Sequence, residues 1–429
     1  MIRLPNLRHK RGFANEIFAL YGIQIANIII PLLTLPILGR YLGTKDYGLY
    51  AIIQSIIVIV SLVVEFGFAF SATRMVAQAS TDRTALSSIV AGVNGAKLIL
   101  SLVLIGAAFI AYLILKNQEG FLGLKVLVII YVGALSIGWM PFWYFQGQQK
   151  LSKLATLDVC VKIFFTTLLF FAMKEKPDVY TALYLMIASN VTTCTYGLIV
   201  MRREVVNVPL SFKRSTAMLV RGRDMAIYRI LSTSIGSINS ILLGTFTNTT
   251  IVANYAGAEK LAAGSRFYIT PFNQLFLARV SSYGRKNLAQ AKREFLFSFW
   301  LLIASSITIL AVGWALAPRI VAFFLGDAFT DAITILRILL LFSPLYVLGN
   351  TLSTQWMIPL GMDKAYNLII TFSALSNILL MVLLVPKFGL TGLMSVVGLT
   401  ELLICISMLI YLSKFKMNPF LRLENVSSR

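Results

Sequence analysis

The chain has 429 residues, of which 58% are hydrophobic and only 13% are charged, and its mean hydropathy is +0.81. A soluble domain carries about 25% charged residues, so this composition excludes a soluble globular enzyme. The formal net charge of +21 raises the question of a nucleic-acid partner, which depends on where the basic residues lie along the chain.

Apolar runs of roughly 20 residues recur along the whole sequence, and each is long enough to cross a hydrocarbon core of ~30 Å. Backbone N–H and C=O groups in lipid must be hydrogen-bonded within the protein, and these runs are too long and too continuously apolar for barrel strands. Each run is therefore predicted to be a transmembrane helix. In chain order, the predicted spans are 16–38, 48–72, 88–115, 125–146, 155–173, 180–201, 226–246, 251–277, 295–316, 332–358, 366–385 and 392–413.

The basic residues gather on one side of this predicted topology. If the N-terminus lies inside, the inner loops and tails hold about three times as many lysines and arginines as the outer loops. The positive-inside rule then places both termini in the cytoplasm, and the net charge indicates topology rather than nucleic-acid binding. Cys160, Cys194 and Cys405 fall inside spans, without the spacing of a disulfide or metal site.

The longest polar stretch lies in the middle of the chain and separates two groups of six spans. We predict an N-terminal lobe over residues 1–201, a basic cytoplasmic linker over 202–225 and a C-terminal lobe over 226–429. Because six is even, the two lobes would be parallel repeats around a central cavity. Segments 38–51 and 243–256 support this repeat, since each begins with Leu-Gly and ends with Tyr-Ala.

Enzyme chemistry is disfavoured by what the sequence contains. The single histidine, His9, lies in the basic N-terminal stretch, and the predicted outer loops reach only about 16 residues, whereas membrane enzymes that act on lipid-linked sugars need a sizeable external loop. No catalytic residue, metal site or cofactor is expected. A purely structural scaffold is also disfavoured, because many polar residues lie within the spans.

Charged side chains inside spans are the most informative residues. Each costs ~2.5–3.5 kcal/mol on insertion scales, so each is expected to face the protein interior or a water-filled cavity. These residues are Glu65, Lys97, Asp158, Lys162, Arg229, Glu259, Lys260, Arg266, Arg337 and Glu401. Asp158 and Lys162 have the spacing of an ion pair on one helix. A purely structural ion pair explains these two residues as well as a functional site does. Lys97 and Arg266 have no acid on their own helix face and are predicted to bind substrate.

The predicted seventh span is unusually polar. Small residues recur every four positions from Ser232 to Gly244, a spacing that allows close helix packing. Hydroxyl and amide groups would equally suit a sugar ligand, and the candidate sugar-facing residues are Ser232, Ser237, Asn239 and Ser240. The aromatic residues of 139–145 are predicted to anchor the fourth span at the membrane interface, with sugar stacking as the alternative. Pro31, Pro36 and Pro271 are predicted to kink their helices.

Several of these segments resemble the Wzx-type polysaccharide transporter family, the O-antigen and capsule flippases of the multidrug/oligosaccharidyl-lipid/polysaccharide exporter superfamily. The likeness runs from the first span to the twelfth. The segments that carry it are LPILGRYLG at 35–43, DYGLYA at 46–51, EFGF at 65–68, SATR at 71–74, WYFQG at 143–147, YAGAEKL at 255–261 and the segment 388–401.

The resemblance implies a flippase of the bacterial cytoplasmic (inner) membrane. Its expected substrate is an undecaprenyl-pyrophosphate-linked oligosaccharide, a repeat unit of O-antigen, capsule or exopolysaccharide, moved from the cytoplasmic to the outer leaflet by alternating access. Membrane lipids, a polysaccharide polymerase and chain-length machinery are its expected partners. The cations expected to attract the pyrophosphate are Lys97, Arg266, Lys260, Arg40 and Arg74. The candidate coupling acids are Glu65, Glu259, Glu401 and Asp158.

Two other functions stay open at this point. A cation-coupled multidrug exporter of the same superfamily would need an acid-dominated cavity, whereas the intramembrane charges here favour bases. A membrane enzyme acting on lipid-linked sugars is disfavoured by the short outer loops.

Overall fold

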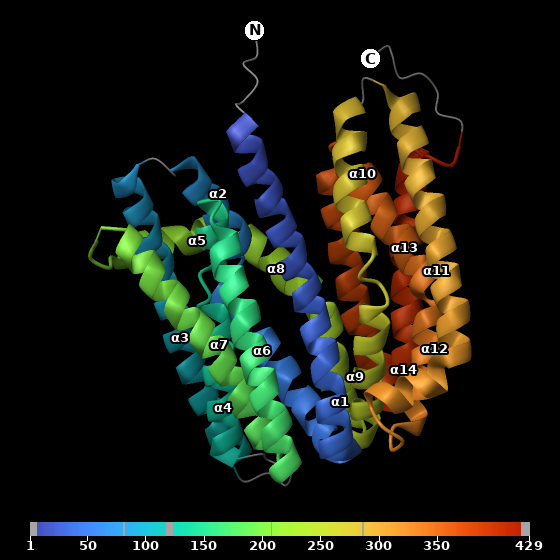
Figure 1. Ribbon diagram of the computed structural model, residues 1–429, viewed down its shortest axis with the longest axis horizontal. Helices are drawn as coiled ribbons and strands as arrows, with labels where there is room; N and C mark the ends of the chain where they lie inside the picture. Colours follow the sequence, from blue (N-terminus) through green and yellow to red (C-terminus); the bar gives the residue numbers. More distant parts are fainter. Residues whose placement is uncertain (1–6, 80–81, 117–122, 207, 285–286, 422–429) are drawn as a thin grey trace. The chain divides into compact units, whose positions relative to one another are not determined.

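A computed structural model of the protein describes residues 7–79, 82–116, 123–206, 208–284 and 287–421, with the side chains of residues 1–28 outside the description. Within these ranges the regular structure is entirely helical (Figure 1). The helices are α1 (Leu7–Glu65), α2 (Phe68–Gln78), α3 (Arg83–Leu115), α4 (Gly123–Gly138), α5 (Phe142–Gly147), α6 (Leu151–Glu175), α7 (Val179–Glu204), α8 (Phe212–Phe246), α9 (Thr249–Gly264), α10 (Ile269–Tyr283), α11 (Leu288–Phe324), α12 (Thr330–Leu341), α13 (Ser343–Thr351), the π-helix η1 (Leu352–Met357) and α14 (Asp363–Lys414).

Eight helical stretches in the described part are long and apolar enough to cross a membrane. Two of them, Ile29–Gln78 and Asp363–Lys414, are 50 and 52 residues long and each contains a non-helical glycine at which the chain reverses, so each takes part in two passes. The more polar α8 and the α9–α10 pair complete twelve passes. The predicted class, an all-α polytopic membrane protein with about twelve spans, is therefore confirmed.

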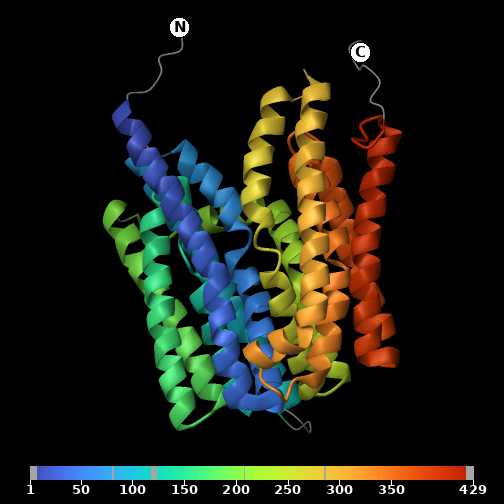
Figure 2. The same ribbon diagram turned by 45° about the vertical axis from the view of Figure 1, so that its right-hand side comes forward.

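Each double pass turns at a single glycine. Gly43 has φ 68° and ψ −178°, and Gly389 has φ 53° and ψ −126°, conformations that are strained for a residue with a β-carbon. Across the second turn, Asn377 Nδ2 donates to Thr400 Oγ1 at 2.9 Å, which joins the two antiparallel halves of α14. Figure 2 shows the last half of α14 as a straight rod, coloured red.

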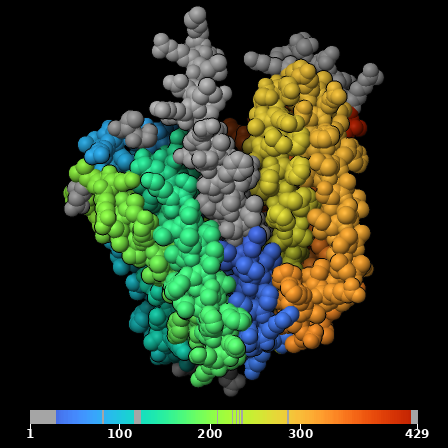
Figure 3. Space-filling view, in the orientation of Figure 1, coloured from blue at the N-terminus to red at the C-terminus, as the bar shows by residue number. Residues whose placement is uncertain are grey.

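The contacts divide the chain into two compact units, Met1–Ser237 and Ile238–Arg429. In unit 1, α1 packs against α4 and α6, and α2 packs against α5. In unit 2, α9 packs against α12, and α11 packs against α10 and α12. The outer flank of α11 (Figures 1 and 3) exposes large apolar side chains, as expected for a helix facing lipid. The division into lobes at the 202–225 linker stays a prediction, although α8 already begins at Phe212 and makes much of that stretch helical.

Four passes are interrupted by short non-helical breaks, and these breaks position the charged residues. In unit 1 they lie at Phe66–Gly67, between α1 and α2, and at residues 139–141, between α4 and α5. In unit 2 they lie at residues 265–268, between α9 and α10, and at Phe342, between α12 and α13. Each break frees backbone groups that must find other partners when buried.

The expected interfacial anchor at the end of the fourth span is wrong. The kinks at Pro31 and Pro36 stay a prediction, since both prolines lie inside α1, where Gly43 is the residue with non-helical backbone angles. Trp143, Tyr144 and Phe145 are almost fully buried in the core of unit 1, where they pack against α2, α3 and α6. They do not anchor the span at the membrane interface, because the break at residues 139–141 directs this part of the fourth span toward the protein core.

The start of α3 is set by a conventional cap. Asp82 accepts hydrogen bonds from the Thr84 side chain and from the backbone N–H groups of Thr84 and Ala85. These bonds, that of the Thr84 side chain first, hold the pKa of the Asp82 carboxyl below its ordinary value. The group lies at the helix terminus, outside the bilayer.

Candidate functional site

Unit 1 contains a charged pocket with a volume of about 340 Å³ beside the break between α4 and α5. Its charged residues come from α1, α6 and α8, and its aromatic residues come from α5. The lining residues are Glu65, Ala69, Ile137, Met140, Phe142, Trp143, Asp158, Lys162, Asn190 and Arg229. Two acids and two bases therefore line one pocket together with two aromatic rings.

The predicted pair on α6 is formed. Lys162 Nζ lies 2.6 Å from Asp158 Oδ2, and the Asp158 side chain is only 3% exposed. A buried carboxylate without a partner would cost several kcal/mol, and the lysine compensates much of this cost. Asp158 and Lys162 are therefore matched in charge within the pocket.

Glu65 occupies the break between α1 and α2. Its carboxylate accepts hydrogen bonds from the backbone N–H groups of Ala69 at 2.8 Å and Gly67 at 3.3 Å, so it caps the N-terminus of α2. Arg229 Nε lies 3.8 Å from the same carboxylate. The backbone of the next two residues explains this role, because Phe66 and Gly67 both have positive φ angles and turn the chain back over the carboxylate.

Lys97 lies on α3 and is 1% exposed. Its Nζ donates to the Gly138 carbonyl oxygen at 2.8 Å and lies 6.0 Å from the centroid of the Trp143 ring. Gly138 is the last residue of α4, so its carbonyl is one of those that a helix end leaves without an intrahelical donor. The ammonium group is thus held by a neutral oxygen and an aromatic ring, and the Glu65 carboxyl is an electrostatic neighbour.

Arg266 has an equivalent environment in unit 2. It lies in the break between α9 and α10, with its guanidinium 4.4 Å from the centroid of the Tyr346 ring and its Nη2 3.5 Å from the Leu339 carbonyl oxygen. Its buried Nε has no hydrogen-bond partner among the described residues. The Glu401 carboxyl on α14 is an electrostatic neighbour.

The two units therefore use the same device at their fourth span. In each, the span breaks next to a proline, a carbonyl before the break accepts from a cation, and an aromatic ring after the break covers that cation. The ring follows the proline by two residues in both units, Trp143 after Pro141 and Tyr346 after Pro344. This spacing is visible in the sequence, but it does not show that the helix breaks there or which cation the ring covers.

A second polar cluster in unit 2 surrounds Glu259. Asn239 Nδ2 donates to the Tyr255 hydroxyl oxygen at 2.8 Å, and that hydroxyl donates to Glu259 Oε1 at 3.2 Å. Lys260 is an electrostatic neighbour of Glu259. The structure thus brings Asn239, Glu259 and Lys260 of the predicted set into one cluster.

The remaining predicted site residues lie apart from these clusters. Arg40 on α1 and Arg74 on α2 are exposed. On α8, Ser240 is buried and Ser237 is half-buried. The side chain of Ser232 lies outside the described residues. Asn190 and Tyr346 were not predicted, because a lone amide or aromatic residue in an apolar span gives no distinguishing sequence pattern. Phe142 belongs to the aromatic residues of 139–145, for which sugar stacking was the alternative prediction.

Twelve passes with charged groups buried around broken helices define a polytopic membrane protein built like a transporter. The chain belongs to the family described as "Polysaccharide biosynthesis protein", whose model matches residues 13–278.

Two curated relatives match nearly the whole chain. One, from Escherichia coli (strain K12), is named "Putative O-antigen transporter" and is 25% identical over 425 residues, covering 95% of this chain and 99% of the relative. A protein of the same name from Shigella dysenteriae is 24% identical over 402 residues, covering 92% of this chain and 98% of the relative.

Solved structures share the fold. The lipid II flippase MurJ, in an inward closed conformation, matches with a TM-score of 0.72 at 16% identity, covering 93% of this chain and 87% of that one. An inward-facing multidrug transporter of the MATE family matches with a TM-score of 0.68 at 16% identity, covering 94% and 100%. At this level of identity the likeness shows the fold alone.

Proposed function

We propose that the protein is a flippase for a lipid-linked oligosaccharide in the bacterial cytoplasmic membrane. Its carrier lipid would be undecaprenyl pyrophosphate, and movement would run from the cytoplasmic to the outer leaflet by alternating access, with both termini in the cytoplasm. The observation that carries the proposal is the pair of cations formed by buried Lys97 and half-buried Arg266, each held by a neutral carbonyl and an aromatic ring. The names of the two curated relatives support the substrate class.

A lipid-linked oligosaccharide needs a protein because its head group is strongly hydrated. Each hydroxyl moved into hydrocarbon without a hydrogen bond costs several kcal/mol. A few sugars carry about ten hydroxyls, so the barrier exceeds ~20 kcal/mol and unassisted flipping is very slow. A polar pocket removes most of this barrier while the lipid tail stays in the bilayer.

Lys97 and Arg266 can exchange their carbonyl partner for a phosphate oxygen. An anionic oxygen adds the Coulomb attraction between opposite charges, which a neutral carbonyl lacks, so the exchange favours the pyrophosphate. Asp158 and Lys162 neutralise one another and offer no such excess charge. Outward movement of the anion is further favoured by an inside-negative potential, by ~2.3 kcal/mol per charge per 100 mV.

The other predicted residues enter the proposal in supporting roles. Exposed Arg40 and Arg74 would attract the anionic head group, while Ser237, Asn239 and Ser240 would meet sugar hydroxyls. The rings of Phe142 and Trp143 line the charged pocket and would stack on sugar faces. Lys260 would add to the attraction for the pyrophosphate.

A cation-coupled multidrug exporter remains the second candidate. The hydrogen-bonded chain from Asn239 through Tyr255 to Glu259 favours it, since a buried carboxyl held in this way can take up and release a proton. In the flippase, Glu259, Glu401 and Glu65 would serve instead as coupling acids.

The test is reconstitution in proteoliposomes with an undecaprenyl-pyrophosphate oligosaccharide, with a sugar-cleaving enzyme reporting its arrival in the opposite leaflet. We expect protein-dependent arrival that the double variant Lys97→Ala/Arg266→Ala abolishes at normal expression. The matched control is Lys125→Ala/Arg337→Ala. These cations also face rings, Tyr180 at 3.8 Å and Trp314 at 5.6 Å, but lie outside the two cation sites.

Full transport by the double variant would refute the role of the two cations. Absence of sugar transport, together with efflux of a cationic dye under an ion gradient, would favour the exporter instead.

A further inference from the structure

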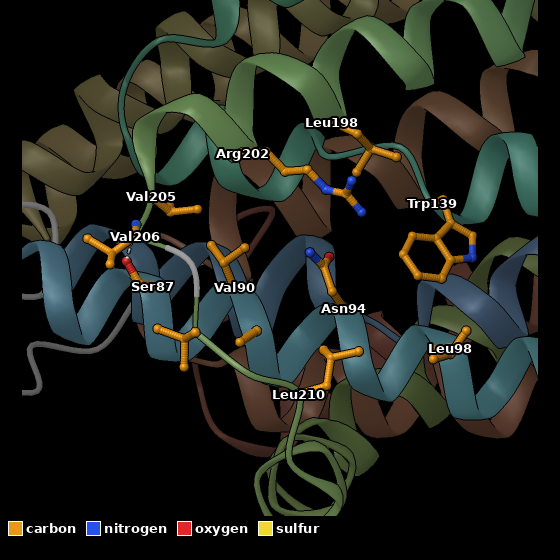
Figure 4. A pocket seen from close by; sticks show the side chains of 12 residues that line it. Ser87, Val90, Asn94, Leu98, Trp139, Leu198, Arg202, Val205, Val206 and Leu210 are labelled. Atoms are coloured by element: carbon orange, nitrogen blue, oxygen red, sulfur yellow. Dashed lines mark hydrogen bonds between the residues drawn. The ribbon is translucent and has the colours of Figure 1, made fainter.

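Unit 1 contains a second pocket, with a volume of about 590 Å³, that shares no lining residue with the charged pocket. It lies between α3, α7 and the segment that leads to α8 (Figure 4). Its walls are mostly apolar, and Leu98, Val206 and Leu210 are 43%, 56% and 60% exposed. The pocket is therefore open to its surroundings along an apolar rim.

Two polar side chains point into this pocket without a partner. Arg202, in the last turn of α7, and Asn94, on α3, make no hydrogen bond or ion pair within the described part of the chain. Figure 4 shows the guanidinium and the carboxamide pointing toward one another across the pocket, with no bond drawn between them. Arg202 is exposed and Asn94 is half-buried, so both groups are accessible to a ligand, and an anionic oxygen would form a charge-assisted hydrogen bond with the guanidinium.

The other polar groups of the pocket are already bonded. Ser87 Oγ donates to the Arg83 carbonyl oxygen at 2.6 Å and accepts from Val206 N at 2.9 Å. Trp139 Nε1 donates to Ser101 Oγ at 3.0 Å. Arg202 and Asn94 are therefore the groups that remain for a ligand.

We propose that this pocket is the site of a resident anionic phospholipid. Its phosphate would bind the guanidinium of Arg202 and the amide of Asn94, and an acyl chain would lie along the apolar side chains of α3 and α7. Arg202 is at the end of a membrane-spanning helix, the depth at which lipid head groups lie. Inorganic phosphate fits less well, because it would leave the apolar wall in contact with water.

This lipid is distinct from the transported one. It would bridge α3, α7 and Leu210, which precedes α8, without contact with Lys97 or the residues of the charged pocket. The lipid site can therefore be refuted without refuting the proposed transport function, and the transport function can be refuted without refuting the lipid site.

The experiment is native mass spectrometry of the delipidated full-length protein, titrated with phosphatidylglycerol or with phosphatidylcholine of the same acyl chains. We expect one phosphatidylglycerol to bind more tightly than the rest. The variant Arg202→Gln should weaken that binding by about tenfold or more, the usual size for one hydrogen bond to a charged group. Asn94→Leu keeps the side-chain volume and should weaken the same binding step by a smaller factor.

The matched control is Arg203→Gln, which removes the same charge from the neighbouring residue, exposed and outside the pocket. Equal losses in Arg202→Gln and Arg203→Gln would overturn the proposal, because binding would then follow general charge. Equal affinity for the two lipids would overturn it as well. Displacement of phosphatidylglycerol by inorganic phosphate at comparable concentration would show a phosphate site and also refute it.

Discussion

Replacement of Glu65 by glutamine separates two roles that this side chain could have. The carboxylate accepts hydrogen bonds from the backbone of Gly67 and Ala69 and lies 3.8 Å from Arg229 Nε. The amide oxygen of glutamine can replace one of these acceptors, while its NH₂ group cannot accept the other N–H. One hydrogen bond to a charged group is therefore lost, which costs about 1.5–3 kcal/mol of the free energy of unfolding.

The ion pair adds little to this loss. The Arg229 side chain is 39% exposed and the distance is long, so solvent screening limits the pair to about 0–1 kcal/mol. We expect Glu65→Gln to destabilise the protein by about 2–3 kcal/mol in total. Thermal unfolding of the detergent-solubilised protein measures this change. Glu175→Gln, at the exposed end of α6, is the matched control and should change stability by no more than about 0.5 kcal/mol.

Transport assays of the same variants complete the test. If Glu65 is the cap of α2, the folded fraction of Glu65→Gln keeps the ion dependence of the wild type. Unchanged stability combined with loss of ion dependence would refute the capping argument and identify Glu65 as a coupling acid.

Three further predictions follow from the local geometry. Gly67→Ala would place a β-carbon 2.7 Å from the backbone of α8, at a residue with positive φ, so the yield of folded protein should fall sharply. Gly106→Ala has open space around it and should be neutral or slightly stabilising. Size-exclusion profiles compare the two variants, and equal profiles would contradict the close approach of Gly67 to α8. Asp158→Ala removes the hydrogen-bonded ion pair with Lys162 and should cost about 1.5–3 kcal/mol. Adding Lys162→Met should recover part of this loss, and a double variant less stable than the single one would exclude the ion pair as the cause. Because the pKa of Asp82 is lowered in the folded state, its stabilising effect is present above the unfolded pKa of about 4 and lost as the pH falls through the folded value. Asp82→Ala should speed hydrogen exchange in the first turn of α3 at neutral pH, and the difference from wild type should disappear in acid; a difference that persists there would contradict the cap.

The helical passes were predictable because each depends on composition summed over a long segment. The predicted spans 88–115 and 180–201 lie within α3 and α7, and the polar loops between spans mark the ends. The breaks were missed because each depends on a distant partner. Nothing local to residues 139–141 indicates that the freed Gly138 carbonyl is bonded by Lys97 from another helix.

The charged residues likewise include contacts that the sequence predicted and contacts that it did not. The spacing of Asp158 and Lys162 on one helix predicted their ion pair correctly. The sequence singled out Lys97 and Arg266 because neither has an adjacent acid on its own helix face. It could not show that carbonyl oxygens and aromatic rings hold them or that Glu65 and Glu401 of other helices are their electrostatic neighbours. Contacts within a helix can be read from sequence spacing, whereas contacts between helices need the fold.

The single-residue turns at Gly43 and Gly389 have a consequence for biosynthesis. The segment between the passes of each pair is short and helical apart from one glycine. We therefore expect each pair to enter the membrane together as a helical hairpin, driven by the summed hydrophobicity of both passes. An alanine at Gly43 would meet no neighbouring atom within 4 Å, so its penalty would fall on the turn itself. Such a variant should delay insertion of the first hairpin during translation rather than weaken the packing of the finished protein.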